Sequence, residues 1–264
     1  MFNDNPNQKN IIELRDISQS YDGGKNWIIQ DLDFLIEDKP NQGQFVVLLG
    51  MSGSGKSTVL RYMAGLQKPT KGTVLVKGAE VDNQRVSMVF QQYSSLPWMT
   101  VLENVGLALK FKGVSRKERD EKAMELIKLV GLEGHEQKFA QYPTLSGGQL
   151  QRVAIARSLL ANPEILIMDE PFGALDVKTR LTMQDLLTNI WRQFQSTIVF
   201  VTHDISEAVY LADDIYIMKS QPSKIVEHIH VDLPIERNRL TKRDPNYIAL
   251  VHEVEDKMIS VSEL

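Results

Sequence analysis

A glycine-rich stretch near residue 50 carries residue types suited to binding phosphate groups. Residues 50–57 read Gly-Met-Ser-Gly-Ser-Gly-Lys-Ser, which fits the pattern G-x-x-x-x-G-K-[ST]. The apolar residues 45–49 before it indicate a buried strand, and residues 59–64 after it favour a helix. Glycines let backbone N–H groups approach phosphate oxygens, and a helix start adds unpaired donors and partial positive charge. A flexible Gly/Ser turn is the alternative, which the flanking strand and helix disfavour.

Two side chains at the end of this loop indicate how a nucleotide could be held. The Lys56 ammonium can reach β- and γ-phosphates, and the Ser57 hydroxyl can ligate Mg²⁺. The loop therefore predicts a nucleotide phosphate site, but it does not indicate what the energy of the nucleotide is used for.

Two carboxylates follow another apolar run. Residues 165–168 indicate a buried strand, and Asp169 and Glu170 stand at its carboxyl end, the edge at which open α/β sheets bind ligands. There Asp169 could hold Mg²⁺, and Glu170 could accept a proton from an attacking water molecule. Two charges that end a strand in solvent are the alternative, which the phosphate loop upstream disfavours.

Three further side chains stand at strand ends. Gln91 follows residues 86–90 and could ligate the metal or position a water molecule, but the spacing fits a solvated glutamine equally well. His203 closely follows the apolar run 197–201 and could touch a γ-phosphate, although sequence alone does not favour this over a structural role. Tyr21 could stack on a purine base, but its position alone favours a surface tyrosine.

A second candidate anion site reads Leu-Ser-Gly-Gly-Gln at residues 145–149. Ser146 suits the N-cap of a helix over residues 150–160. The two glycines after it again let an anion approach backbone donors at a helix start. An ordinary Ser-Gly-Gly helix entry is the alternative.

Strand and helix patterns alternate along most of the chain, and a helical block interrupts them. Strand patterns stand at residues 11–17, 32–36 and 73–76, and from about residue 93 the apolar period changes to that of helices. The alternation predicts an α/β fold, and the interruption predicts an inserted helical subdomain.

The helical block carries its own boundary signals. Ser115 and Glu118 fit a capping box, and Gly131 suits the end of the helix that follows. The apolar residues of that helix fall on one face: Ala123, Leu126, Ile127 and Val130. Charges of both signs at residues 116–122 indicate a solvated face and not a nucleic-acid patch.

The end of the chain predicts a closing hairpin and a last helix. Residues 215–218 and 224–229 form two strand patterns around a turn at residues 221–223. Pro245 suits a helix start. The helix after it would be amphipathic, with one apolar face: Tyr247, Val251, Val254 and Met258.

Composition excludes several classes of protein. The 264 residues are 42% hydrophobic and 24% charged, as in ordinary globular proteins, and the net charge of −4 argues against nucleic acid as the main partner. The absence of cysteine excludes disulfides and thiolate metal sites. No apolar run approaches the roughly 20 residues of a membrane-spanning helix, and residues 1–6 lack the features of a signal peptide. We therefore expect any membrane association to go through a partner or the protein surface.

Five motifs, in this order, resemble the nucleotide-binding subunit of ATP-binding cassette (ABC) transporters over about residues 11–231. They are the loop that ends at Lys56, Gln91, residues 145–149, the Asp169-Glu170 pair and His203. Many ATPases share the phosphate loop, whereas Leu-Ser-Gly-Gly-Gln before an acidic strand is specific to this superfamily.

The resemblance implies the α/β core of a phosphate-loop NTPase. An N-terminal antiparallel β subdomain would belong to it, and an α-helical subdomain would be inserted at about residues 93–160. Residues 1–10 would form a flexible N-terminus, and residues 232–264 a C-terminal extension with an amphipathic helix.

Catalytic and binding roles follow from the same resemblance. Glu170 would be the catalytic glutamate, His203 would hold the γ-phosphate and water, and Gln91 would sense the metal and the permease. Mg²⁺ would be held by three side chains, those of Ser57, Gln91 and Asp169. ATP would stack on Tyr21 and lie in the phosphate loop: Gly50, Met51, Ser52, Gly53, Ser54, Gly55, Lys56, Ser57 and Thr58.

A second copy of the chain would complete each site. The ATP held by one copy would meet the Leu-Ser-Gly-Gly-Gln turn of the other: Ser146, Gly147, Gly148 and Gln149. Asp176 would communicate across this homodimer.

Looser patterns at residues 91–101, 171–176 and 231–234 are similar to the nitrate, sulfonate and taurine importer group. They imply uptake of a small solute of that kind through separate membrane permease subunits, with a periplasmic or lipid-anchored solute-binding protein and no nucleic acid. The chain would lie peripherally at the cytoplasmic face of the inner membrane. An exporter or lipid-trafficking ABC system is the alternative. Two departures, the long turn at residues 38–43 and Met51 in place of proline, touch no catalytic position.

Overall fold

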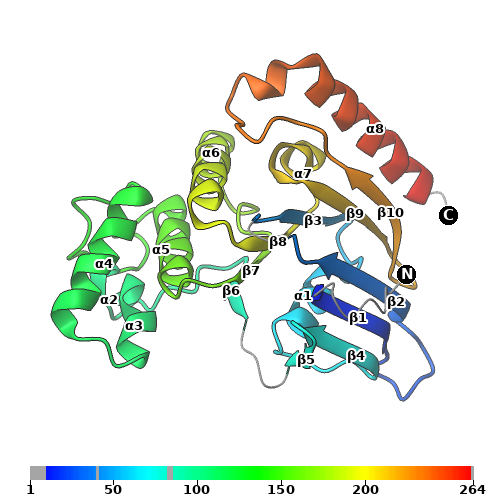
Figure 1. Ribbon diagram of the computed structural model, residues 1–264, viewed down its shortest axis with the longest axis horizontal. Helices are drawn as coiled ribbons and strands as arrows, with labels where there is room; N and C mark the ends of the chain where they lie inside the picture. Colours follow the sequence, from blue (N-terminus) through cyan, green and yellow to red (C-terminus); the bar gives the residue numbers. More distant parts are fainter. Residues whose placement is uncertain (1–9, 40–41, 82–85, 263–264) are drawn as a thin grey trace. The chain divides into compact units, whose positions relative to one another are not determined.

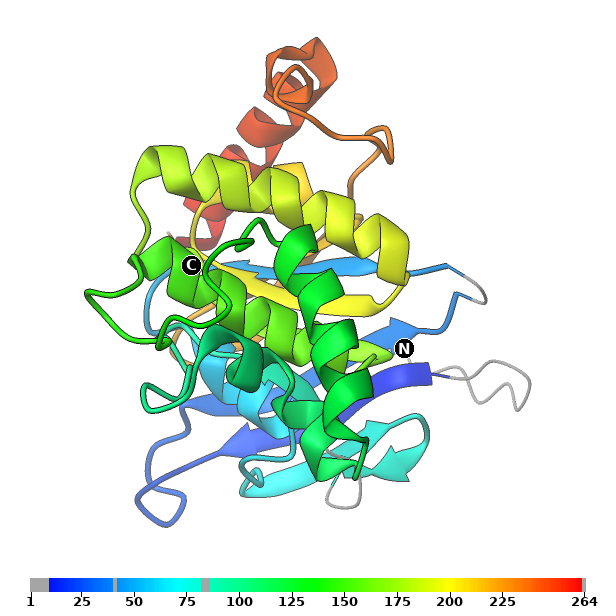
Figure 2. The ribbon, with the colours of Figure 1, turned by 90° about the vertical axis from the view of Figure 1, so that its left-hand side faces the viewer.

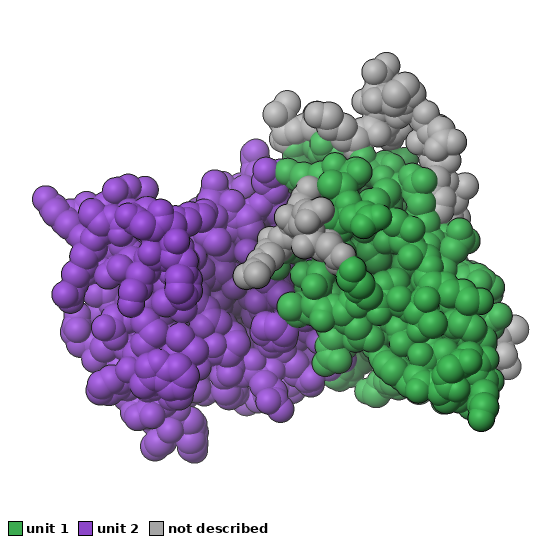
Figure 3. Space-filling view, turned by 90° about the horizontal axis from the view of Figure 1, so that it is seen from below, with its two compact units in different colours: residues 1–86, 197–264 green, residues 87–196 purple. Residues whose placement is uncertain are grey.

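The structure is a computed structural model that describes residues 10–39, 42–81 and 86–262. The predicted flexible N-terminus lies outside these residues apart from Asn10, as does part of the long turn expected at residues 38–43. The chain divides into two compact units (Figure 3). Residues 1–86 and 197–264 form the first, and residues 87–196 form the second.

Alternating apolar residues build an antiparallel sheet in the first unit. Its strands are β1 (Asn10–Gln19), β2 (Ile29–Glu37), β4 (Lys71–Val76) and β5 (Ala79–Glu80), in the order β2-β1-β4-β5. Three side chains of β1 are completely buried, those of Ile12, Leu14 and Ile17. The predicted N-terminal antiparallel β subdomain and the strand patterns within it are confirmed.

β3 (Phe45–Gly50) lies between parallel neighbours in the same unit. It pairs with β8 (Thr197–Thr202) and β9 (Asp214–Lys219), and β10 (Lys224–His230) pairs antiparallel with β9. Every residue of β3 and β8 is buried, as expected for parallel strands covered on both faces. α1 (Lys56–Met63) follows β3, and α7 (Ile205–Leu211) follows β8 (Figure 1).

The C-terminal extension packs onto this unit. The β9–β10 hairpin confirms the predicted closing turn, and the short 3₁₀ helix η2 (Thr241–Arg243) leads into α8 (Pro245–Ser262). α8 lies beside α7 and β10 (Figure 1). Tyr247 and Val254 of its predicted apolar face are buried. None of the described helices is long and apolar enough to cross a bilayer.

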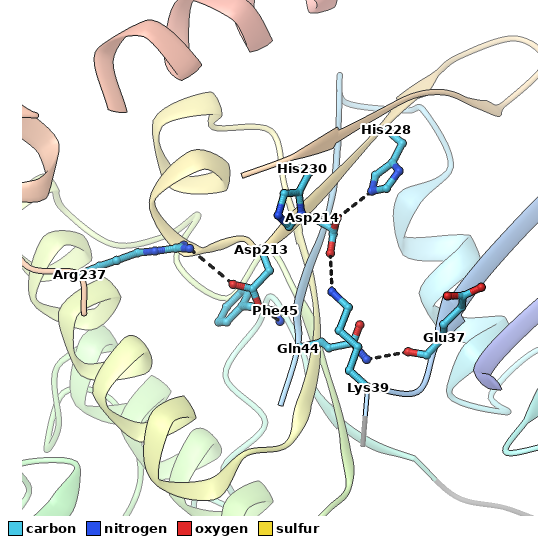
Figure 4. Close-up of polar contacts among 9 residues, drawn as sticks. All are labelled: Glu37, Lys39, Gln44, Phe45, Asp213, Asp214, His228, His230 and Arg237. Carbon is cyan, nitrogen blue, oxygen red and sulfur yellow. Dashed lines mark hydrogen bonds and ion pairs between the residues drawn. The ribbon is translucent and has the colours of Figure 1, made fainter. Parts of the chain in front are cut away.

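Charged side chains fasten the extension and the hairpin to the start of β3 (Figure 4). The buried Arg237 guanidinium donates to two carbonyls at the end of α7, those of Tyr210 and of the C-cap Ala212. It lies 3.5 Å from the Asp213 carboxylate, which accepts from the Phe45 N–H. Asp214 hydrogen-bonds to three side chains, those of Lys39, His228 and His230. Burial alone would raise the pKa of Asp214, but the two histidine hydrogen bonds and the Lys39 charge outweigh burial and lower it.

The second unit combines parallel strands with a helical bundle. β6 (Ser87–Val89) pairs in parallel with β7 (Ile165–Asp169). The helices are α2 (Val101–Val105), α3 (Leu107–Phe111), α4 (Arg116–Leu129), α5 (Gly147–Leu160) and α6 (Val177–Phe194). α2, α4 and α5 pack together (Figure 2). The predicted apolar face of α4 is buried. The predicted helical subdomain falls inside this unit, and its bounds stay a prediction.

The predicted C-terminal end of α4 is confirmed, but the capping box predicted at its start forms only in part. The helix ends just before Gly131, as predicted. At its start Ser115 Oγ accepts from the Glu118 N–H (3.4 Å), but the Glu118 carboxylate accepts from Lys122 Nζ (2.8 Å). The second bond of the predicted capping box, from the Ser115 N–H to the Glu118 carboxylate, is therefore wrong. That carboxylate instead forms an ion pair with Lys122, one helical turn away.

Candidate functional site

The phosphate loop folds as its sequence predicts, between a buried strand and a helix. β3 ends at Gly50, and α1 begins at Lys56. The Lys56 side chain is only 4% exposed, and Nζ donates to the carbonyls of Gly50 and Met51 at 2.9 Å each. The loop therefore holds a cation among its own carbonyls, beside the start of a helix.

Two glycines of the loop, Gly50 and Gly55, leave no room for a larger residue. A methyl group on Gly55, which has φ +84°, would lie 2.8 Å from Ser223 Oγ. A methyl group on Gly50 would lie 2.6 Å from the Met218 carbonyl. The Ser54 hydroxyl is fully buried in the loop, and no described residue hydrogen-bonds to it. These contacts make the loop a close-fitting backbone cradle.

His203 stands beside this loop. β3 and β8 run in parallel, with Leu49 opposite Thr202, so that Gly50 and His203 are the next residues of neighbouring strands. The His203 side chain is exposed, and the Ser57 and Thr58 side chains in the first turn of α1 are half-buried. The fold therefore brings the predicted histidine to the same sheet edge as the phosphate loop.

Tyr21 is 66% exposed and is held by a residue that sequence analysis missed. Gln67, just after α1, donates from Nε2 to the Tyr21 hydroxyl at 3.1 Å. This bond orients the ring at the surface. Neither sequence spacing nor residue type points to Gln67.

In the second unit the two predicted polar strand ends lie together. β6 and β7 are parallel, with Val89 opposite Met168, so that Gln91 and the Asp169-Glu170 pair follow the same sheet edge. A methyl group on Gly173 would lie 3.7 Å from Glu170 Oε2 and 3.8 Å from Gln91 Nε2.

The backbone at Glu170 is unusual. Its φ of +40° is rare for a residue other than glycine, and its carbonyl accepts from the Gly173 N–H at 3.1 Å. Asp169, by contrast, is the last residue of β7 and is 7% exposed. The turn thus separates two adjacent carboxylates, one buried and one half-buried.

The Leu-Ser-Gly-Gly-Gln segment starts α5. Ser146 is an exposed N-cap, and it forms a complete capping box with Gln149 at 2.9 and 3.3 Å. The two glycines are packed from different sides. A methyl group on Gly147 would overlap the Tyr93 hydroxyl, and one on Gly148 would lie 2.5 Å from Thr179 Cγ2. Sequence analysis missed both packing partners.

Asp176 is the N-cap of α6. Its carboxylate accepts from the Thr179 hydroxyl (2.6 Å) and from the Thr179 N–H (3.0 Å). These bonds lower the pKa of Asp176, the side-chain bond more than the backbone bond, and keep the exposed group ionised.

The predicted site residues are thus spread over both units. The first unit carries Tyr21, residues 50–58 and His203, and the second carries Gln91, Ser146, Gly147, Gly148, Gln149, Asp169, Glu170 and Asp176. Among the described residues, no group of three or more His, Cys, Asp or Glu side chains could hold a metal ion by itself. The predicted magnesium ligands are not a group of that type, because they combine one carboxylate, that of Asp169, with the hydroxyl of Ser57 and the amide of Gln91.

Known proteins match the chain over most of its length. A family profile described as "ABC transporter" matches residues 36–173. The nitrate import ATP-binding protein NrtD of Synechocystis is 41% identical over 92% of this chain and 93% of its own length. The taurine import ATP-binding protein TauB of Pseudomonas savastanoi is 40% identical over 90% and 92%, respectively.

A third relative and a solved structure agree with these matches. The aliphatic sulfonates import ATP-binding protein SsuB of Bacillus licheniformis is 43% identical over 81% of this chain and 82% of its own length. A dimeric ATP-binding cassette, solved in a post-hydrolysis state with ADP and Pi, superimposes with a TM-score of 0.70 at 32% identity. That likeness covers 84% of this chain and 100% of the cassette.

Proposed function

The chain belongs to the ABC transporter family, and on this premise we propose that it is the ATP-hydrolysing subunit of an importer, working through a separate membrane permease. The observation that carries the proposal is the phosphate loop, a glycine cradle around the Lys56 ammonium at the start of α1. The matched relatives are named as ATP-binding proteins of import systems, which favours import over an exporter or lipid-trafficking system.

The phosphate loop suits the triphosphate of ATP. Bound phosphate oxygens would draw the Lys56 ammonium away from the loop carbonyls, since an anion is a stronger acceptor than a neutral carbonyl. The helix start would add backbone donors for the same oxygens. Tyr21, exposed and held by Gln67, would carry the adenine base.

The residues present also fit Mg²⁺. This ion prefers carboxylate, hydroxyl and carbonyl oxygens, and the side chains of Asp169, Ser57 and Gln91 supply one of each kind. Ser57, Gln91 and Asp169 would hold the ion. When bound, it would neutralise charge on the β- and γ-phosphate oxygens.

Glu170 would act as the base of hydrolysis. The oxygen of a water molecule attacks the γ-phosphorus, the bond to the β–γ bridging oxygen breaks, and the Glu170 carboxylate takes a proton from the water. ADP and phosphate leave. The Gln91 amide, which like the Glu170 carboxylate borders Gly173, would help to position the water, and His203 would hold the γ-phosphate.

Two copies would share each ATP. The exposed Ser146 hydroxyl and the backbone donors at the start of α5 would meet the γ-phosphate held by the other copy, with Gln149 supporting the turn. The matched cassette structure, a dimer with ADP and Pi, supports this arrangement. Asp176 would contact the other copy.

The solute would be a small anion. The matched relatives are named for nitrate, taurine and aliphatic sulfonates, and we propose a solute of this class for the importer. A periplasmic or lipid-anchored solute-binding protein would deliver it to the permease. The chain would sit peripherally on the permease, at the cytoplasmic face of the inner membrane.

Glu170→Gln tests the function with ATP binding as its internal control. We expect the variant to bind ATP like the unaltered chain and to lose hydrolysis by about a hundredfold or more, because the amide cannot accept the proton. Phosphate release and titration with a fluorescent ATP analogue measure the two properties. Unchanged turnover would contradict the role of Glu170. Co-purification with its permease, with a rise in ATPase activity, tests the transport assignment.

A further inference from the structure

Tyr93 lies against the first turn of α5. A methyl group on Gly147 would overlap the Tyr93 hydroxyl and lie 2.9 Å from Cζ, so the ring edge occupies the space that a side chain would need. Tyr93 is 38% exposed and is no core residue. Its contact with the start of α5 is therefore a specific surface contact at a turn that the proposed function assigns to ATP.

The residue after Tyr93 is attached to the same helix further along. Arg157 of α5 donates to the Ser94 carbonyl (2.9 Å) and to the Ser94 hydroxyl (2.7 Å). Burial lowers the pKa of Arg157, but a guanidinium stays protonated in proteins. Both bonds are therefore charge-assisted. The segment 93–94 is thus held to α5 at two points, ten residues apart along the helix.

The same segment begins at Gln91. Its amide nitrogen and a Glu170 carboxylate oxygen both lie within 4 Å of the place that a methyl group on Gly173 would take. Residues 91–94 therefore run from the proposed base to the start of α5. On the other side of that start, Thr179 packs on Gly148 and is itself hydrogen-bonded to Asp176.

We propose that Tyr93 is a positioning residue that couples the two ATP sites of the dimer. The inference rests on the proposed function, in which Gln91 and Glu170 serve the ATP of their own chain while Ser146 and Gly147 serve the ATP of the partner. A shift of the Gln91 segment on nucleotide binding moves the Tyr93 ring. Because the ring abuts Gly147, the shift reaches the turn that completes the other site.

Steady-state ATPase measurements on the full chain, with ATP varied, test this coupling. For Tyr93→Ala we expect kcat to fall about tenfold, as for a displaced positioning group, and the Hill coefficient to fall from above 1 to about 1. Binding of a fluorescent ATP analogue should stay within about twofold, since the phosphate loop is untouched. Tyr93→Phe keeps the ring edge against Gly147 and should retain the cooperativity.

Phe111→Ala is the matched control, because Phe111 is 82% exposed on α3 in the same unit. It should leave kcat and the Hill coefficient unchanged. The proposal is overturned if Tyr93→Ala keeps the kcat and cooperativity of the unaltered chain, if Tyr93→Phe is as impaired as Tyr93→Ala, or if the unaltered chain shows no cooperativity. A chain that binds no ATP or does not hydrolyse it overturns the proposed function itself, whatever the variants do.

Discussion

Alanine at Gly147 tests the packing of Tyr93 through stability alone, without any assumption about ATP. The added methyl group would overlap the Tyr93 hydroxyl and lie 2.9 Å from Cζ, so one of the two must move. The ring moves, because it is 38% exposed while Gly147 is fixed in a 14-residue helix. Overpacking of this kind costs about 1–3 kcal/mol, and the higher helix propensity of alanine returns at most about 1 kcal/mol. With the full return, we expect a net loss of up to about 2 kcal/mol.

The effect of Gly147→Ala on the free energy of unfolding should change sign once the Tyr93 ring is removed. In a Tyr93→Ala background the three atoms nearest to the methyl group at position 147 are gone, because all three belong to the Tyr93 side chain, and the propensity gain is no longer offset by them. Gly147→Ala should then be neutral or stabilise the fold by up to about 1 kcal/mol. Urea unfolding of the single and double variants gives the interaction energy, which we expect to be about 1–3 kcal/mol.

Gly148→Ala is the control for this cycle. Its methyl group would meet Thr179 Cγ2 at 2.5 Å, so Tyr93→Ala should leave its cost unchanged. If Gly147→Ala costs the same free energy of unfolding with and without Tyr93, the two residues do not interact and the reasoning is refuted.

Two further predictions concern the first unit. Tyr21→Ala should raise the Kd for ATP about tenfold, since stacking of a base contributes about 1–3 kcal/mol, and Gln67→Leu should raise it less, because it removes only the bond that orients the ring. Fluorescence titration measures both, and a larger effect of Gln67→Leu would argue against stacking. The pKa of Asp214 is lowered from 3.8, so its ionised form stabilises the fold at higher pH and loses that effect as pH falls through the folded-state pKa. Asp214→Asn should therefore be less stable than the unaltered chain at about pH 6 and approach it below about pH 4, and equal differences at both pH values in urea unfolding would contradict this.

Sequence reasoning succeeded where the interacting residues are near one another in the chain. The strand, glycines and helix around Lys56 depend on a short stretch, and so does the predicted N-cap at Ser146. The side chains at the ends of parallel strands could be placed from the sequence equally well. Once residues 86–90 and 165–168 were assigned as strands, Gln91 and Glu170 had to reach the same kind of sheet edge.

Contacts between distant segments were out of reach. No periodicity relates Gln67 to Tyr21, or Ser94 to Arg157, because these pairs meet only after tertiary packing. Even a local rule failed at Ser115, where the Glu118 carboxylate had a choice of donors and the Lys122 ammonium prevailed. The sequence identifies which groups can interact, and competition in the folded chain decides which of them do.

The glycines of the two turns make the same point in physical terms. At Gly50 a methyl group would lie 2.6 Å from the Met218 carbonyl, which belongs to β9 and cannot yield without moving that strand. At Gly147 the obstacle is a half-exposed ring, which can turn aside. A methyl group on Gly53 would meet no atom of the described residues within 4 Å apart from its chain neighbours, so the φ of +82° is what opposes a side chain, at a cost of about 1–2 kcal/mol. The three positions look alike in a motif, but Gly50 should tolerate alanine least, because its obstacle is a fixed strand, whereas the obstacle at Gly147 is a movable side chain and at Gly53 only the residue's own backbone.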